Sequence, residues 1–231
     1  MAAGKALTED AARRESAAQQ ASGGGRAVRK GRAMVHKFDP HAHCKLHSPE
    51  RLRLQPVRPA LELLGLKREH VLIDVGCGSG YFLLPAARRV RTAWGLDISP
   101  EMLGLARAAA VAAGVRNVRT MRICEHCIPG PTGTVDRALV VDVLHEMAAP
   151  IGLLGEIRRV LAPGGRLLVI DWNRRPSPHG PPVSERLGRE RARGMLARAG
   201  FRKITARHIY RHHYALLAEK SPPGQGLVNR S

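Results

Sequence analysis

Hydrophobic and polar positions follow two alternating patterns along the chain. Short apolar runs rich in β-branched residues predict buried strands at residues 71–75, 93–96, 118–121, 138–141 and 166–170. Between them, apolar residues three and four positions apart predict helices at about 81–90, 100–113 and 151–161. The alternation predicts a Rossmann-like, doubly wound α/β fold with a mostly parallel sheet.

Capping residues mark the starts of two helices. Ser48 precedes Pro49, and Ser99 precedes Pro100, so a hydroxyl stands at the N-cap and proline at the first helical position. We expect the first helix to break at Pro56 and Pro59, because proline removes a helical hydrogen bond.

The last third of the sequence predicts a helix followed by a hairpin. The helix is expected from Ser184 to about Ala199, with Gly200 as its C-cap. Alternating residues at 203–208 and 213–217 predict two antiparallel strands, which complete a seven-stranded sheet.

Two further features of this region are read from local sequence. The Pro-Gly-Gly run at 163–165 is expected to close the helix before it. His212 and His213 are expected on a solvated face.

Composition divides the chain of 231 residues into three parts. Residues 1–33 are rich in Ala, Gly, Ser, Gln and Arg without apolar periodicity, which predicts a disordered basic leader. We interpret residues 34–221 as one catalytic domain and residues 222–231 as a disordered tail. No apolar run approaches the roughly 20 residues of a membrane span, and no secretory signal is present, so we expect a cytoplasmic protein.

The net charge of +19, from 38 basic and 19 acidic residues, favours polyanionic partners. Only 3% of residues are aromatic, however, and the basic residues are spread along the chain, whereas binders of single strands need stacking platforms. RNA is therefore a possible partner, and a generally basic surface is the simpler interpretation.

The four cysteines are too few and too irregular for a disulfide framework. Cys124 and Cys127 have the spacing of half a zinc knuckle, and residues 41–47 hold further histidines and Cys44. Because no clean second pair exists, we expect no metal.

A glycine-rich segment, Asp74-Val75-Gly76-Cys77-Gly78-Ser79-Gly80, lies between a predicted strand and a predicted helix. A dinucleotide site would have Gly-x-Gly-x-x-Gly, but here the third glycine comes one residue early. The Asp74 carboxylate would also repel phosphates, whereas it suits a ligand that carries ammonium and sulfonium groups.

This segment resembles motif I of the class I S-adenosylmethionine-dependent methyltransferases. The resemblance covers about residues 34–219 and continues at Asp97 after the second strand, at Asp142 after the fourth, and at residues 158–165 before the fifth. The sequences of residues 97–103 and 180–182 resemble those of type 11 methyltransferases, which are distantly similar to ubiquinone and menaquinone C-methyltransferases.

The resemblance implies a role for each matching residue. Asp74 would help to bind the amino group of the donor's methionine, and Asp97 would accept hydrogen bonds from both ribose hydroxyls. Asp142 would line the methionine or the acceptor side. The other expected donor-binding residues are Gly76, Cys77, Gly78 and Gly80 beneath the donor, and Ile98 and Met102 beside the adenine.

Two positions are interpreted with alternatives. Relatives place an acid near residue 123 for the adenine amino group, but this chain has Ile123, so either Glu125 or backbone atoms would take that role. His145 lies one helical turn after Asp142, where it could be the general base, or it could merely line or pack against the cleft.

The sequence therefore predicts an S-adenosylmethionine-dependent methyltransferase that acts on a small-molecule acceptor. An RNA methyltransferase and a donor-binding protein without turnover are the alternatives. The identity of the acceptor and the oligomeric state are left open.

Overall fold

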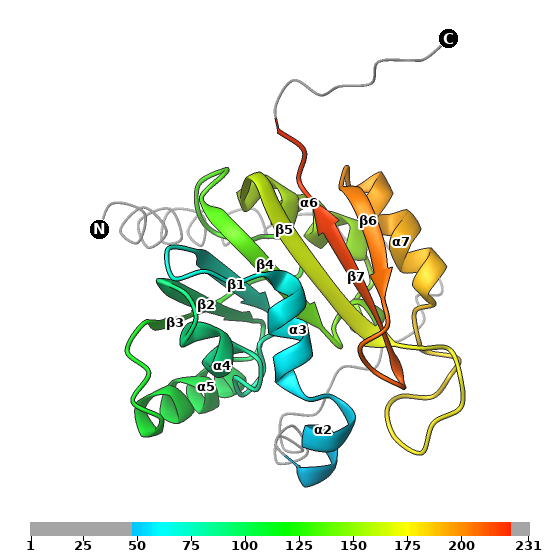
Figure 1. Ribbon diagram of the computed structural model, residues 1–231, viewed down its shortest axis with the longest axis horizontal. Helices are drawn as coiled ribbons and strands as arrows, with labels where there is room; N and C mark the ends of the chain where they lie inside the picture. The colour runs from blue at the N-terminus through cyan, green and yellow to red at the C-terminus, as the bar shows by residue number, and fades with distance from the viewer. Residues whose placement is uncertain (1–47, 223–231) are drawn as a thin grey trace, which may run out of the picture.

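The computed structural model of the protein describes residues 48–222. Their strands form one seven-stranded sheet in the order β3-β2-β1-β4-β5-β7-β6 (Figure 1). The predicted leader at 1–33, nearly all of the predicted tail, and the cluster of possible metal ligands at 41–47 lie outside the described residues.

The first five strands in sequence are parallel to one another. The two C-terminal strands are antiparallel, because β7 pairs with β5 in the opposite direction and β6 pairs with β7. This confirms the doubly wound, mostly parallel sheet with an antiparallel hairpin. The strands are β1 (Val71–Val75), β2 (Thr92–Asp97), β3 (Val118–Arg122), β4 (Val135–Val141), β5 (Leu161–Trp172), β6 (Arg202–Arg207) and β7 (His213–Glu219).

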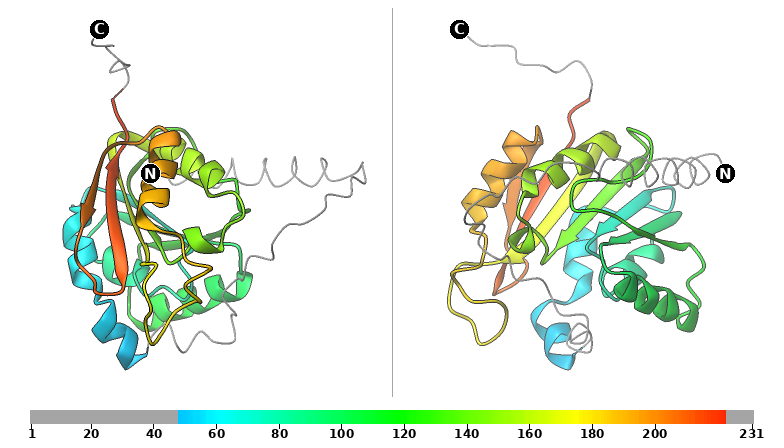
Figure 2. Two further views of the ribbon diagram at one scale, coloured as in Figure 1. Left: turned by 90° about the vertical axis from the view of Figure 1, so that its right-hand side faces the viewer. Right: turned by 180° about the vertical axis from the view of Figure 1, so that it is seen from behind.

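Helices cover both faces of the sheet (Figure 2). Apolar residues of α3, α4 and α5 pack against one face, and those of α6 and α7 pack against the other. The helices are α2 (Pro49–Leu54), α3 (Val57–Leu64), α4 (Leu83–Ala87), α5 (Pro100–Ala112), α6 (Pro150–Val160) and α7 (Arg189–Arg198), with a short 3-10 helix η2 (Leu144–Glu146).

The predicted N-caps are confirmed. The Ser48 hydroxyl accepts a hydrogen bond from the amide of Arg51, and the Ser99 hydroxyl accepts one from the amide of Met102, each at 3.2 Å. The predicted break is present at Pro56, since α2 ends before this residue and α3 begins after it. Pro59 does not break the helix, because it lies in the first turn of α3, where its missing amide costs no helical hydrogen bond. These caps matter for the site, because α2 and the start of α5 both border it.

Helices α4 and α6 differ from the predicted spans. Helix α4 covers residues 83–87 rather than 81–90, because the residues after it form tight turns that lead into β2. Helix α6 ends at Val160, before the Pro-Gly-Gly run expected to close it. The chain is already extended at Leu161, which pairs with Val135 as the first residue of β5.

Helix α7 begins at Arg189, five residues later than predicted from Ser184. Turns occupy the interval, in which the amide of Glu185 donates to the carbonyl of Pro182 and the amide of Arg186 donates to that of Val183. Hydrogen bonds from the Arg186 side chain to the preceding loop then favour this turn over a regular helix.

The carboxyl ends of β1, β2, β4 and β5 share one edge of the sheet with the first residues of β7. Helix α2 and the loop at residues 173–188 lie at this same end, the lower end in Figure 1. Within residues 48–222, no helix is both long enough and apolar enough to cross a membrane.

Candidate active site

A cavity of about 1240 Å³ opens at the carboxyl end of the sheet. Its walls come from α2, the glycine-rich segment, the start of α5, the segment after β3, η2 and the loop after β5. Ligands of doubly wound α/β folds bind at this edge. All the predicted site residues except Gly80 line the cavity, namely Asp74, Gly76, Cys77, Gly78, Asp97, Ile98, Met102, Glu125, Asp142 and His145.

Hydrogen bonds fix the glycine-rich segment to the end of β2. The amides of Gly76 and Cys77 donate to the carbonyl of Leu96 at 2.7 and 3.1 Å. The Asp97 carboxylate accepts from the amide of Gly78 and from that of Ser99, both at 2.9 Å. Asp97 therefore orients two loops of the cavity that it lines.

The glycines permit a close approach of backbone and neighbouring side chains. Gly76 has φ +71°, and a Cβ there would overlap the Val143 side chain. Gly80 has φ +93°, and a Cβ there would overlap Leu84 of α4. Gly80 thus supports the segment from below without lining the cavity.

Asp74 lies on β1 at the start of the glycine-rich segment and is buried, with 2% of its surface exposed. Burial, together with the nearby charge of Asp97, raises the pKa of Asp74 to about 7, although Arg51 acts in the opposite direction. A carboxyl with this pKa is poised to ionise when a cationic ligand binds. This fits the ammonium and sulfonium of S-adenosylmethionine.

The residues expected around the adenine, Ile98 and Met102, both line the cavity. Met102 is buried at 4% exposure, whereas Ile98 is 39% exposed. Ile123 and Glu125 also line the cavity, so an acid is available two residues after the apolar position. The contribution of Glu125 to adenine binding stays a prediction.

His145 forms a hydrogen-bonded pair with an acid that the sequence did not single out. The Nδ1 atom of His145 lies 2.7 Å from Asp171 Oδ1, and the amide of His145 donates to Asp171 Oδ2. Burial acts to lower the pKa of His145, but the hydrogen bond and charge of Asp171 outweigh it, so the pKa is raised. The pair leaves Nε2 as the ring nitrogen that can take a proton.

Asp142 belongs to a second polar cluster, in which it contacts Arg51, Gln55 and His213. One carboxylate oxygen accepts from Arg51 at 3.3 Å and from Gln55 at 3.1 Å, so α2 is fixed to the end of β4. Burial acts to raise the pKa of Asp142, but His213, Arg51 and Gln55 together lower it. Asp142 is therefore ionised, and its backbone has the uncommon φ of +55°.

The expectation that His213 lies on a solvated face is wrong. His213 is 3% exposed, because it begins β7 opposite Trp172 of β5 and its ring packs 4.1 Å from the Trp172 ring. Its Nε2 atom lies 3.3 Å from Asp142 Oδ1. Neither ring nitrogen has a hydrogen-bond partner among the described residues, and His213 lines the cavity.

Arg186 organises the loop at residues 173–188, part of which lines the cavity. Its guanidinium donates to four carbonyl oxygens and to one hydroxyl, namely Pro181 O, Asn173 O, Arg175 O, His179 O and Ser177 Oγ. It also lies 5.1 Å from the centre of the Trp172 ring. These bonds could not be predicted from the sequence, because they link residues with no fixed spacing.

Tyr81 and Cys124 also line the cavity. The Tyr81 hydroxyl donates to the Gln55 carbonyl at 3.0 Å and its ring lies under Arg51, which agrees with a packing role. Cys124 and Cys127 face each other across a tight turn. Within the part of the chain that the structure describes, no three His, Cys, Asp or Glu residues are grouped to hold a metal ion.

Comparisons with known proteins agree with this geometry. A family model described as a methyltransferase domain matches residues 73–169. A ubiquinone biosynthesis O-methyltransferase from Xanthomonas oryzae pv. oryzae is 28% identical over 132 residues, which cover 57% of this chain and 54% of that protein. A demethylmenaquinone methyltransferase from Tropheryma whipplei is 34% identical over 116 residues, which cover 50% and 47%.

A solved structure is similar over a greater length. The crystal structure of a SAM-dependent methyltransferase from Aquifex aeolicus has a TM-score of 0.75 and 29% identity, and the match covers 80% of this chain and all of that one. The chain spans about half the length of the curated relatives it matches. Residues 73–169 match a methyltransferase domain, and the fold of the chain is similar to that of a solved S-adenosylmethionine-dependent methyltransferase.

Proposed function

We propose that this protein transfers a methyl group from S-adenosylmethionine to a small acceptor that must lose a proton. The observation that carries the proposal is the His145–Asp171 pair, whose histidine lines the same cavity as Asp74 and Asp97. A donor site and a base that share one enclosed space favour direct transfer between two bound molecules.

The donor would occupy the half of the cavity between Asp74 and Asp97. Asp74 would meet the methionine ammonium, Asp97 would accept from the ribose hydroxyls, and Gly76, Cys77 and Gly78 would lie beneath the sugar and the methionine. When bound, S-adenosylmethionine supplies a methyl carbon made electrophilic by its sulfonium. The chain's own contribution is to align the acceptor with that carbon and to exclude water.

His145 would act as the general base. Asp171 holds the Nδ1 proton, so Nε2 can receive the proton that the acceptor loses as its heteroatom bonds to the methyl carbon. The carbon–sulfur bond breaks with its electron pair on sulfur. General bases typically contribute about 10²–10⁴-fold to rate, so His145→Asn should reduce transfer by that order.

The acceptor would occupy the other half, between α2, Trp172, His213 and the loop that Arg186 organises. This half offers an aromatic ring and polar side chains, which suit a small ring compound with hydroxyl groups. Two relatives are named for ubiquinone biosynthesis and demethylmenaquinone. Quinone-related compounds are therefore the first acceptors to test.

RNA is the second candidate acceptor, and the net charge of +19 favours it. The test supplies methyl-labelled S-adenosylmethionine with a small-molecule extract or with total RNA. His145→Asn is compared with His208→Asn, which changes an exposed histidine outside the cavity. We expect label in the small-molecule fraction, and we expect only His145→Asn to reduce it.

Label in RNA would instead establish the second candidate. Donor binding without transfer to either fraction would indicate a protein that binds S-adenosylmethionine without turnover. A cytoplasmic location stays a prediction.

A further inference from the structure

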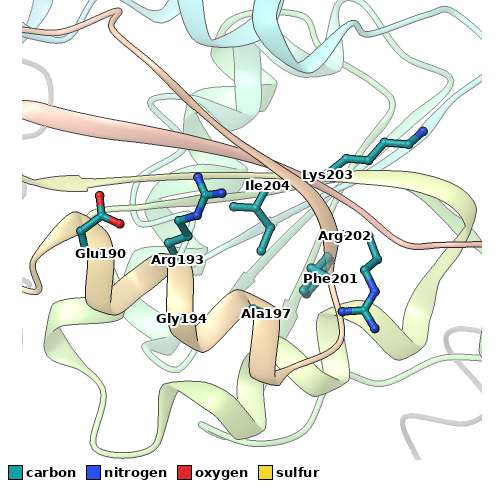
Figure 3. A pocket seen from close by; sticks show the side chains of 8 residues that line it. All are labelled: Glu190, Arg193, Gly194, Ala197, Phe201, Arg202, Lys203 and Ile204. Atoms are coloured by element: carbon teal, nitrogen blue, oxygen red, sulfur yellow. The ribbon is translucent and has the colours of Figure 1, made fainter. Parts of the chain in front are cut away.

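A second, shallower hollow lies between α7 and β6, at the edge of the sheet and apart from the cavity (Figure 3). Arg193 lines it from the helix, and Arg202 and Lys203 line it from the strand, whereas Glu190 is its one acidic residue. Ala192 and Leu196 face the core, which leaves the basic side of α7 toward solvent. The hollow is thus a basic surface that the proposed methyl transfer does not use.

Basic residues extend along α7 and β6 beyond those that line the hollow; together, residues 189–211 are called the α7–β6 surface. Between residues 189 and 211, Glu190 is the single acid in the sequence, and the basic residues are Arg189, Arg191, Arg193, Arg198, Arg202, Lys203, Arg207 and Arg211. Two of them have acidic partners, because Arg189 pairs with Glu190 and Lys203 pairs with Glu219. The remaining cations have no ion pair among those found in residues 48–222, so their charge is available to a partner.

The shape of the hollow favours a chain of anions over a single one. Figure 3 shows the Arg193 side chain extending from α7 toward β6. The side chains of Arg202 and Lys203 extend from β6 in different directions. The three cations therefore do not converge on one point. Gly194 and Ala197 also line the hollow, and these small residues leave open space beside the helix. A Cβ at Gly194 would meet no atom within 4 Å.

Backbone geometry also exposes these residues. β6 is the last strand of the sheet and pairs only with β7. Its register shifts between Arg202 and Thr205, and Lys203 within this bulge has φ +49°. A bulge on an edge strand redirects side chains, and here it turns successive basic residues outward.

We propose that the α7–β6 surface binds the phosphodiester backbone of a nucleic-acid duplex. Arginine presents a planar fork that matches phosphate oxygens, and separated cations fit successive phosphates. Helix α7 and strand β6 contain no aromatic residue, and Phe201 between them is only 1% exposed. The lack of a stacking platform favours a duplex over a single strand.

An anionic membrane is the other polyanion that such a surface meets. Membrane-binding faces combine basic residues with exposed apolar ones. The exposed large apolar residues within the described part of the chain are Leu52, Ile98 and Val111, and none of them lies on α7 or β6. The duplex is therefore the partner that the surface fits.

The experiment measures binding of a short labelled RNA duplex to the full chain over a range of salt concentrations. The test variant combines Arg193→Glu, Arg202→Glu and Lys203→Gln, the last because a glutamate would face Glu219. The control variant combines Arg91→Glu, Arg107→Glu and Arg116→Gln near the opposite edge of the sheet. Both variants change the net charge equally, and folding is verified by circular dichroism and by binding of S-adenosylhomocysteine.

We expect the test variant to bind the duplex at least tenfold more weakly and to reduce the slope of log affinity against log salt by about 2 to 3. The control variant should lose much less. Equal losses in both variants would mean that net charge alone drives binding and would overturn the proposal. Tighter binding to phosphatidylglycerol vesicles than to the duplex, with the same sensitivity to the test variant, would also overturn it. None of these outcomes depends on methyl transfer.

Discussion

The Nδ1 atom of His145 lies 2.7 Å from Asp171 Oδ1, and Asp171 is completely buried. His145 follows β4, whereas Asp171 is near the end of β5, so the pair exists only because these parallel strands are neighbours. Asp171 also accepts hydrogen bonds from the amides of His145 and Trp172. The carboxylate therefore fixes both the position and the tautomer of the histidine.

Replacing Asp171 with asparagine should lower the pKa of His145. Burial then acts without the opposing charge, so we expect the imidazole to titrate below its value in the unchanged protein. Nuclear magnetic resonance of the histidine ring protons measures this shift, with exposed His208 as the internal control. An unchanged titration of His145 would contradict the pairing.

The pKa of Asp74, about 7, predicts that donor binding depends on pH. Below this pH the carboxyl is protonated and must lose its proton to face a cation, so affinity should rise up to tenfold per pH unit and level off above it. Calorimetry in buffers of different ionisation enthalpy should show proton release. Asp74→Asn should bind more weakly and without this dependence, whereas a flat profile in the unchanged protein would contradict the assignment.

Gly76 and Gly114 provide a matched pair of left-handed glycines, with φ +71° and +65°. Alanine at Gly114 meets no atom within 4 Å, so it should cost about 1 kcal/mol of unfolding free energy from backbone strain alone. Alanine at Gly76 would also overlap Val143 and should cost about 1–3 kcal/mol more. Chemical denaturation measures both, and equal costs would contradict the tight packing of the glycine-rich segment.

Arg186→Met should make the loop at residues 173–188 less ordered, while the part of the cavity between Asp74 and Asp97 stays intact. The substitution removes five hydrogen bonds from a nearly buried guanidinium, at an expected cost of about 2–4 kcal/mol. Trypsin should then cleave at Arg174 or Arg175 faster, with binding of S-adenosylhomocysteine changed less than about twofold. Arg189→Met, on the exposed start of α7, is the control and should change neither. Cleavage at the unchanged rate in Arg186→Met would contradict the role of Arg186.

Features set by nearby residues were predictable from the sequence. Ser99 and Pro100 specify the start of α5 through one local hydrogen bond, and the run from Asp74 to Gly80 marks the turn between β1 and α4. Both signals act over a few residues, so no knowledge of the tertiary fold was needed. The mostly parallel sheet followed from the alternation of strands and helices.

Features that join distant segments were not predictable in the same way. Arg51 and Asp142 are 91 positions apart, and His213 reaches Asp142 only because β7 inserts between β5 and β6. A histidine at the start of an alternating strand looks solvated until its neighbours are known. The start of α7 was misplaced for a similar reason, since contacts of Arg186 with a loop override local helical preference.

The donor site is tested most directly by calorimetry with S-adenosylmethionine and S-adenosylhomocysteine. The Asp97 carboxylate accepts the Gly78 and Ser99 amides and faces the expected ribose, so Asp97→Ala should abolish binding of both. His145→Asn should retain it, because that residue is assigned to the acceptor's proton. Micromolar binding that is lost only in Asp97→Ala is the predicted result. Failure of the unchanged protein to bind either ligand, or full binding by Asp97→Ala, would contradict the account.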